Sequence, residues 1–311
     1  MHAISIPSPF KSSLIALLLA LLIVGIESVE NQNLFWGPLH DSAHAFAAYL
    51  CTALLISLLK SEQQTTGFRL AQIGGSLFAT GIAIELIQPA LGRSASFTDI
   101  YYNFVGIVCA LAVSASRQLN PVPKACVRVI SLALLLSSLT VPAIGAATLS
   151  KRNQAIPSLL NFEDSWQRRL YRAGGSANLS LISKPKGWEN ASTALKVDFP
   201  TTKYPGVSVP HVFPDWRNYH FLKLSIFSKN QDTIALTIRI HDKKHNHSYE
   251  DRYNQRFEIQ PGTNDIEIEL SAVQHAPKAR QMDMGEITGL AMFAAQPEET
   301  FSLYFDDLRL Q

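Results

Sequence analysis

The stretch E-L-I-Q-P-A-L-G-R-S-A-S-F-T-D-I-Y-Y-N-F-V-G, residues 85–106, joins two apolar segments through a short polar connection. It places Glu85, Arg93 and Asp99 in a neighbourhood where most side chains are hydrocarbon. In a lipid bilayer such a group costs about 2.5 kcal/mol or more unless it pairs or faces water. Crossing a membrane requires none of these residues, so they define the first candidate site.

Charge is distributed unevenly along the 311 residues. Residues 1–150 contain 7 Lys and Arg and 6 Asp and Glu, whereas residues 151–311 contain 20 and 19. The first part is apolar enough for a membrane domain and the second is polar enough for a soluble one. Each part is nearly neutral, which argues against nucleic acid as a partner. We predict a multi-domain protein with an all-α transmembrane helical bundle at 1–150 and an all-β domain at 151–311.

Five apolar runs are long enough, or nearly so, to cross about 30 Å of hydrocarbon. They are residues 12–29, 43–59, 70–91, 97–116 and 127–149. The first run follows a basic residue, as the apolar part of a signal peptide does. It lacks a convincing small-x-small cleavage site, however, and further apolar runs follow, so we read it as a retained helix. We therefore predict five spans.

Loop charges orient this bundle. Six positive charges flank the span ends that we assign to the cytoplasm: Lys11, Lys60, Arg69, Arg117, Lys124 and Arg128. The positive-inside rule then predicts a cytoplasmic N-terminus and an extracytoplasmic domain at 151–311, in the bacterial cytoplasmic (inner) membrane. Membrane lipid is accordingly an expected partner.

This orientation brings distant polar residues to one extracytoplasmic rim. The rim residues lie at the outer ends of the second, third and fourth spans: His40, Asp41, His44, Glu85, Gln88, Asp99 and Asn103. Arg93 lies in the short loop between the third and fourth spans. Residues three or four positions apart share one face of a helix, and Gly106 allows a neighbouring helix to approach beneath the polar residues.

The rim resembles the VanZ-like membrane domain over about residues 12–118. The matching segments are HDSAHAFAAYL at 40–50, ELIQPALGR at 85–93 and SASFTDIYYNFVG at 94–106. That family takes its name from a protein associated with glycopeptide (teicoplanin) resistance. The resemblance implies a role in the cell envelope and in antibiotic resistance, and it implies a site without naming a reaction.

Three interpretations of the rim remain open. Arg93 could simply tie the helix ends together by bridging Glu85 and Asp99. Alternatively, Arg93 could bind a phosphate or carboxylate while His44 performs acid–base work with Glu85 or Asp99. In that case the catalytic candidates are His44, Glu85, Arg93 and Asp99, and the substrate-binding candidates are Asp41, Gln88 and Asn103.

The substrate would then be a glycan or a lipid-linked cell-wall precursor, and whether the protein is an enzyme stays open. His40 and His44 also have the spacing of metal ligands, but no HExxH pattern accompanies them. We therefore predict no metal at the rim.

After residue 150 the pattern changes to short runs with a period of two, separated by turn signals. The runs are 179–183, 194–199, 222–228, 234–241, 256–260, 265–270, 290–294 and 301–310. This pattern favours a β-sandwich of the jelly-roll type.

The opening of this domain, NFED at 161–164, and its ending, FSLYFDDLRL at 301–310, resemble carbohydrate-binding modules and galactose-binding-like domains over about residues 158–311. The resemblance implies that the first and last strands are neighbours. It also implies a structural calcium ion near them, with Glu163 and Asp307 as candidate ligands, although solvated acids at strand ends explain the same pattern. We expect no other cofactor.

Sugar recognition needs flat aromatic faces and planar hydrogen-bonding groups. Two polar, aromatic segments supply them, and we take Trp216, His241, Arg252 and Tyr253 as substrate-binding candidates. Two hypotheses follow. The first is a VanZ-like envelope protein that binds or processes a glycan substrate at its outer rim. The second is a non-catalytic membrane anchor that presents a polysaccharide- or protein-binding β-sandwich.

Overall fold

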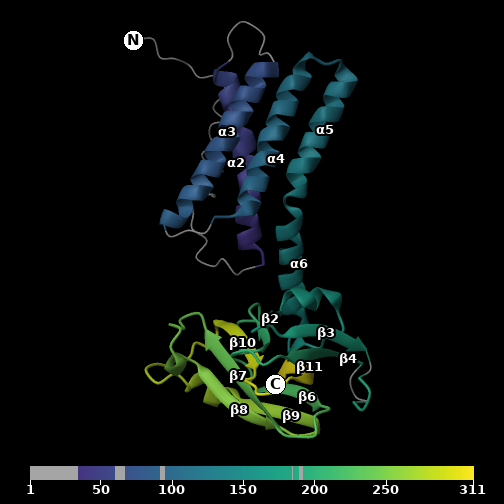
Figure 1. Ribbon diagram of the computed structural model, residues 1–311, viewed down its shortest axis with the longest axis vertical. Coiled ribbons are helices and arrows are strands. Elements are labelled where there is room, and N and C mark those ends of the chain that lie inside the picture. The colour runs from purple at the N-terminus through teal and green to yellow at the C-terminus, as the bar shows by residue number, and fades with distance from the viewer. Residues whose placement is uncertain (1–33, 60–66, 92–94, 184, 189–191) are drawn as a thin grey trace. The chain divides into compact units, whose positions relative to one another are not determined.

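The computed structural model describes residues 34–59, 67–91, 95–183, 185–188 and 192–311. The chain divides into two compact units, Met1–Ala146 and Ala147–Gln311. The first consists of helices and the second mainly of two β-sheets (Figure 1). The expected span at 12–29 and the rim residue Arg93 lie outside the described residues.

The helices of the first unit are α2 (Trp36–Leu58), α3 (Gly67–Ile87), α4 (Phe97–Ala115), α5 (Pro121–Ser137) and α6 (Thr140–Ala155), the last running into the second unit. Short 3₁₀ turns extend α3 through Gln88–Leu91 and α4 through Ser116–Gln118. In the described part of the chain, α2 and the extended α3 and α4 are long and apolar enough to cross a membrane.

The prediction of one continuous span at 127–149 is wrong. The chain forms two helices there, α5 and α6, which are bent by 42° at the break between them. The described residues thus hold three candidate spans, or four if the bent pair counts as one, whereas the predicted span at 12–29 lies outside them. Pro142 explains the break because it has no N–H for the carbonyl of Ser138, four residues earlier. Ser42 in α2 donates its hydroxyl to that carbonyl at 2.7 Å instead.

Helices α2 and α4 are in close contact at Gly106. A Cβ added to Gly106 would lie 2.1 Å from the carbonyl oxygen of Ala45 and 2.9 Å from the Cβ of Ala48. Any larger side chain would therefore push the two helices apart. The expectation that Gly106 admits a neighbouring helix is confirmed.

The described residues of the second unit form eleven strands. They are β1 (Ser158–Leu160), β2 (Arg172–Gly174), β3 (Asn178–Ser183), β4 (Thr193–Phe199), β5 (Gly206–Val209), β6 (Phe221–Ser228), β7 (Ile234–Asp242), β8 (Tyr253–Ile259), β9 (Gly262–Glu269), β10 (Ile287–Phe293) and β11 (Phe301–Leu310). A short helix, α7 (Leu270–Gln274), follows β9.

The strands form two antiparallel sheets. Sheet A has the order β3-β4-β11-β6-β9, with β1 also paired to β11, and sheet B has the order β2-β5-β10-β7-β8. The pairing of Leu160 in β1 with Leu308 in β11 confirms that the first and last strands are neighbours. The predicted β-sandwich is thus confirmed in its antiparallel, two-sheet architecture.

The core of the sandwich is made by alternate residues of the strands. On β4 and β7 the inward side chains are at most 1% exposed: Leu195, Val197, Phe199, Leu236, Ile238 and Ile240. Buried positions therefore recur every second residue along these segments, as the period-two pattern predicts. The polar side chains on the outward face of sheet B are not needed for this core.

Candidate functional site

The polar residues predicted at the helix ends of the first unit come together in the structure. His44 Nε2 on α2 lies 3.6 Å from Asp99 Oδ2 on α4, and the two side chains are only 10% and 11% exposed. The side chain of Asn103, one turn further along α4, lies within hydrogen-bonding reach of the His44 ring. His44 Nε2 is buried without a hydrogen-bond partner among the described residues. The imidazole and the carboxylate are thus placed as a pair that could exchange a proton.

Glu85 belongs to the same region and has a structural partner. It is 2% exposed, and its Oε2 accepts a hydrogen bond from the backbone N–H of Ser96 at 3.0 Å. Ser96 in turn caps α4, because its hydroxyl oxygen accepts a hydrogen bond from the backbone N–H of Asp99 at 3.3 Å. These bonds tie the end of α3 to the start of α4.

The other rim residues lie around this centre. Asp41 is the most open, with its side chain 39% exposed and its Oδ1 4.0 Å from His40 Nδ1. The rings of His40 and His44 are 5.6 Å apart, and Gln88 is buried in the 3₁₀ turn that follows α3. A bridge from Arg93 stays a prediction, since that residue is not described.

A second polar cluster lies on the outward face of sheet B. Arg239 on β7 is paired with Asn254 on β8 and with Ala291 on β10. The same row continues through Ser208 on β5 to Arg172 on β2. These residues alternate with the buried ones of their strands and therefore lie on the side of the sheet away from the core.

His241 stands beside this row, opposite Gly289 on β10. A Cβ at Gly289 would lie 2.1 Å from His241 Cε1. The imidazole therefore lies over β10 at Gly289 and occupies space that any other residue would fill with its side chain. Arg252, directly before β8, holds its guanidinium carbon 5.4 Å from the centroid of the Tyr249 ring. Tyr249 is 69% exposed and offers an aromatic face beside the polar groups.

The polar atoms of this cluster are not satisfied by the protein itself. Arg239 Nε, His241 Nδ1, Arg252 Nε and Asn254 Oδ1 are buried without a hydrogen-bond partner among the described residues. Buried polar atoms in folded proteins are normally paired with protein groups, water or a ligand. We call these four residues the sheet B cluster.

Burial and neighbouring charge also set the protonation of the sheet B cluster. Burial lowers the pKa of Arg239 from its ordinary value, and the nearby Arg252 lowers it further. Burial, followed by Arg239, His245 and Arg252, lowers the pKa of His241 to about 4. The cluster at neutral pH therefore consists of two guanidinium cations, a neutral imidazole that can donate or accept, and an amide.

The loop between β7 and β8 is held in place by ion pairs. Arg280 Nη2 donates to Asp242 Oδ1 at 2.7 Å, and Arg280 Nε donates to Asp251 Oδ1 at 2.6 Å. The ring of His245 lies 2.9 Å from the carbonyl oxygen of Asp251. Because Arg252 follows Asp251 directly, this network fixes the position of one member of the sheet B cluster.

Trp216 and Tyr253, the other predicted sugar-binding residues, lie elsewhere. Trp216 is 0% exposed and its indole N–H donates to the carbonyl of Phe213 at 2.6 Å, so no face of the ring is open to a sugar. Tyr253 is 5% exposed and paired with Ile240, on the core side of the sheet. Its burial raises the pKa of Tyr253 to about 12. The structure thus unites His241 and Arg252 but separates them from these two aromatic residues.

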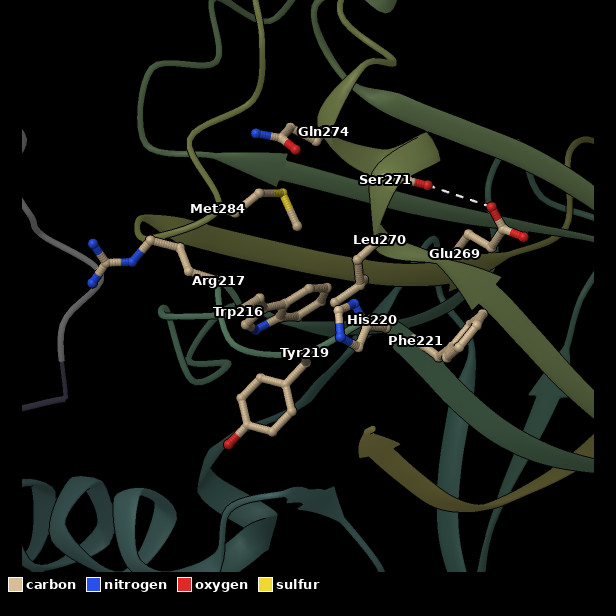
Figure 2. A pocket seen from close by; sticks show the side chains of 10 residues that line it. All are labelled: Trp216, Arg217, Tyr219, His220, Phe221, Glu269, Leu270, Ser271, Gln274 and Met284. Carbon is tan, nitrogen blue, oxygen red and sulfur yellow. Dashed lines mark hydrogen bonds between the residues drawn. The ribbon is translucent and has the colours of Figure 1, made fainter.

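A hollow of about 540 Å³ lies beside Trp216. Its buried lining consists of Trp216, Leu270 and Met284, while Tyr219 also borders it (Figure 2). The side chain of Arg217 is directed away from the others in Figure 2 and is bound to an acidic residue of its own segment. The hollow is a second place where an aromatic residue meets an apolar floor.

The expected calcium ligands are already engaged. Both carboxylate oxygens of Glu163 accept hydrogen bonds from Thr193, at 2.9 and 3.0 Å, and Asp307 is ion-paired with Arg309. Among the described residues no group of three or more His, Cys, Asp and Glu could hold a metal ion. Asp306, not Asp307, interacts with Glu163: burial first and then Glu163 raise the pKa of Asp306 to about 7. A structural calcium ion at Glu163 and Asp307 therefore stays a prediction.

Sequence reasoning missed Arg239 and Asn254. Both stand at outward positions inside strands, where polar residues usually face solvent. The sequence could have indicated Arg239 through its spacing. Arg239 and His241 are two positions apart, so their side chains lie on the same face of β7.

Comparison with known proteins gives likeness of fold for the β-sandwich. No model of a protein family matches the chain, and no curated protein matches it. Among solved structures, the family 11 carbohydrate-binding module from Clostridium thermocellum, in complex with a β-1,3-1,4-mixed-linked tetrasaccharide, is 16% identical, with 50% of this chain and 94% of that chain covered at a TM-score of 0.39.

An exo-β-agarase is 15% identical over 50% of this chain and 24% of its own, at a TM-score of 0.40. The family 30 carbohydrate-binding module of a Clostridium thermocellum cellulosomal cellulase is 13% identical. The match covers 46% of this chain and 91% of the module, at a TM-score of 0.37. Over about half its length the chain is similar to these two carbohydrate-binding modules and to part of this exo-β-agarase, whereas the VanZ-like assignment of the first unit stays a prediction.

Proposed function

We propose that this protein is a membrane-anchored polysaccharide-binding protein whose ligand lies on the outward face of sheet B. The observation that carries the proposal is the sheet B cluster, with its buried donors and acceptor that lack partners. Sugar hydroxyls both donate and accept hydrogen bonds, so one sugar chain can serve guanidinium, imidazole and amide groups together. The exposed ring of Tyr249 beside Arg252 adds a flat apolar surface for a sugar ring.

The anchor in this proposal is the helical unit. Its three long apolar helices support a place in the membrane, and the loop charges favour an extracytoplasmic sandwich in the bacterial inner membrane. A tethered binding domain of this kind would hold the cell-envelope glycan close to the membrane surface.

Binding of polysaccharides to the full chain in lipid nanodiscs tests the proposal, and nanodiscs avoid the sugar head groups of common detergents. Tyr249→Ala is expected to weaken binding about tenfold, the effect of removing one aromatic anchor. Tyr219→Ala, an equal truncation at the hollow beside Trp216, is expected to leave binding unchanged. If the Tyr219 variant alone loses binding, the ligand occupies the hollow and the proposal fails.

A second candidate function concerns the helical unit, and one observation favours it: the buried His44 Nε2 facing Asp99 at 3.6 Å. We infer that this pair, together with Glu85, binds or processes a lipid-linked glycan or cell-wall precursor, whose head group would suit an outward-facing polar rim. Such a pair can move a proton to or from a substrate hydroxyl or phosphate.

Glycopeptide susceptibility of cells that express the protein tests this second function. His44→Gln is expected to abolish any protection while the protein still inserts at normal levels. Thr80→Ala is the control, because Thr80 is exposed on α3 and bonded only to its own helix. Full protection in the His44 variant would contradict this function. The contact between His44 and Asp99 would then serve only to hold α2 and α4 together.

A further inference from the structure

We infer that the outward face of sheet B selects an anionic polysaccharide, one that carries carboxylate, sulfate or phosphate groups. This inference rests on the proposed glycan-binding function and adds the charge class of the ligand.

Three arginines of this face have no counterion among the described residues. Arg172 and Arg239 stand in one row across the sheet, and Arg252 lies close enough to Arg239 to act on its charge. None of the three forms an ion pair with another residue of the described chain. Arginine presents a planar fork of N–H donors that matches carboxylate, sulfate and phosphate oxygens.

The acidic residues nearby are already taken. Asp242 and Asp251 bind Arg280 on the loop side, and Glu258 on β8 is paired with Arg256 at 2.9 Å. The charges of Arg239 and Arg252 therefore repel each other, which costs free energy in the empty protein. An anion between them removes this repulsion and satisfies their N–H groups at once, whereas a neutral sugar does only the second.

The spacing of the charges points to a polymer and not to a small ion. Arg172 on β2 and Arg239 on β7 are separated by β5 and β10, which is three strand spacings or roughly 14 Å. A single phosphate or sulfate is too small to contact both. The row between them carries only the small side chains of Ser208 and Ala291, so an extended chain with repeated charges can lie along it.

His241 suits this arrangement because it adds no further charge. Its ring lies across Gly289, and its pKa is lowered to about 4 by burial and by the surrounding cations. At neutral pH it is a hydrogen-bonding group that can serve a sugar hydroxyl beside the anionic group held by the arginines.

The test compares matched pairs of polymers on the full chain in zwitterionic nanodiscs. Polygalacturonate is set against its methyl ester, dextran sulfate against dextran, and a phosphorylated dextran against the same dextran. The expected result is binding of a charged member at least tenfold tighter than its neutral counterpart, with the preferred pair naming the anionic group.

Arg239→Gln should remove that preference, because one charge-assisted hydrogen bond corresponds to about tenfold or more in affinity. Arg256→Gln is the matched control: it removes the same charge from the same face of the sheet, but from a residue already paired with Glu258. Its binding should stay within about threefold of wild type. Unchanged melting curves establish that both variants are folded.

Three outcomes overturn the inference, and they differ in whether the proposed glycan-binding function survives. Equal binding of charged and neutral polymers, with loss in Arg239→Gln, leaves a glycan-binding face without charge selectivity. Equal losses in Arg239→Gln and Arg256→Gln show unspecific attraction of polyanions. Binding of no polymer at all removes the proposed function together with the inference.

Discussion

Replacing Asp306 by asparagine should stabilise the β-sandwich at neutral and alkaline pH. Asp306 lies where β11 bulges away from β6, and burial together with Glu163 raises the pKa of its carboxyl from 3.8 to about 7. Between these values the folded protein keeps a proton that the unfolded chain has lost. Folding is therefore opposed progressively as the pH rises from about 4 to about 7, and the penalty is complete above pH 7.

The size of the effect follows from the shift. A shift of about three pKa units corresponds to about 4 kcal/mol at 1.36 kcal/mol per unit, and solvent screening of this half-buried carboxyl reduces the effect to about 2 kcal/mol. Asparagine carries no ionisable proton, and its amide oxygen can still accept the bond that the backbone N–H of Asp307 now donates at 2.7 Å. Asp306→Asn should thus gain about 2 kcal/mol over wild type at pH 8 and lose this advantage at pH 4.

Urea unfolding of residues 147–311, followed by tryptophan fluorescence with EDTA present, measures the difference between variant and wild type at both pH values. Asp232→Asn, an exposed acid in the turn before β7, controls for the loss of one negative charge. The reasoning is refuted if the Asp306 variant is no more stable than wild type at pH 8, or if its advantage is the same at pH 4.

Three further predictions concern packing and buried charge. Gly106→Val should break the contact of α2 with α4 and lower the melting temperature in detergent. Gly75→Val is the control and should leave the melting temperature unchanged, because a Cβ there would meet nothing within 4 Å. Equal melting temperatures of the two variants would contradict the packing argument. Trp216→Ala should cost the sandwich about 3–5 kcal/mol in urea unfolding, because its ring is fully buried, and a loss below 1 kcal/mol would show that the ring is dispensable. Arg280→Gln should cost about 3–5 kcal/mol by leaving the buried Asp242 unpaired, and a neutral result at pH 7 would mean that water replaces the guanidinium.

The strands that alternation predicts are those long enough to show it. β7 spans nine residues, and its buried positions recur every second residue. By contrast, β1 and β2 have three residues each and β5 has four, so none displays a period. Their places are set by pairing with longer strands, which is a tertiary effect.

The break between α5 and α6 shows what hydropathy leaves out. Residues 127–149 are apolar throughout most of their length, which predicts one span. The decisive feature is a single missing N–H at Pro142, and the freed carbonyl of Ser138 is tolerated because Ser42 donates to it. Composition averages over such a position, whereas backbone hydrogen bonding does not.

The two polar sites were predictable to different degrees. His44 and Asp99 follow from helix order alone, since alternate helix ends meet at one side of a bundle, and their contact at 3.6 Å agrees with that expectation. Arg239 and Asn254 depend on strand register, which one sequence does not reveal. Trp216 is ambiguous from its residue type, because indoles serve both cores and sugar sites, and its 0% exposure decides for the core.

The same contrast explains why we assign ligand binding first to the sandwich. In the helical unit, Glu85 accepts from Ser96, Ser96 caps α4, and His44 faces Asp99, so donors and acceptors of opposite character meet within the protein. The attraction between His44 and Asp99 favours helix packing even without a ligand, although His44 Nε2 lacks a hydrogen-bond partner among the described residues. On sheet B, two guanidinium groups lie close enough to repel each other, and Arg239 Nε and Arg252 Nε lack acceptors among the described residues. Packing alone makes that arrangement worse, so a molecule that supplies acceptors is the physical reason for it to exist.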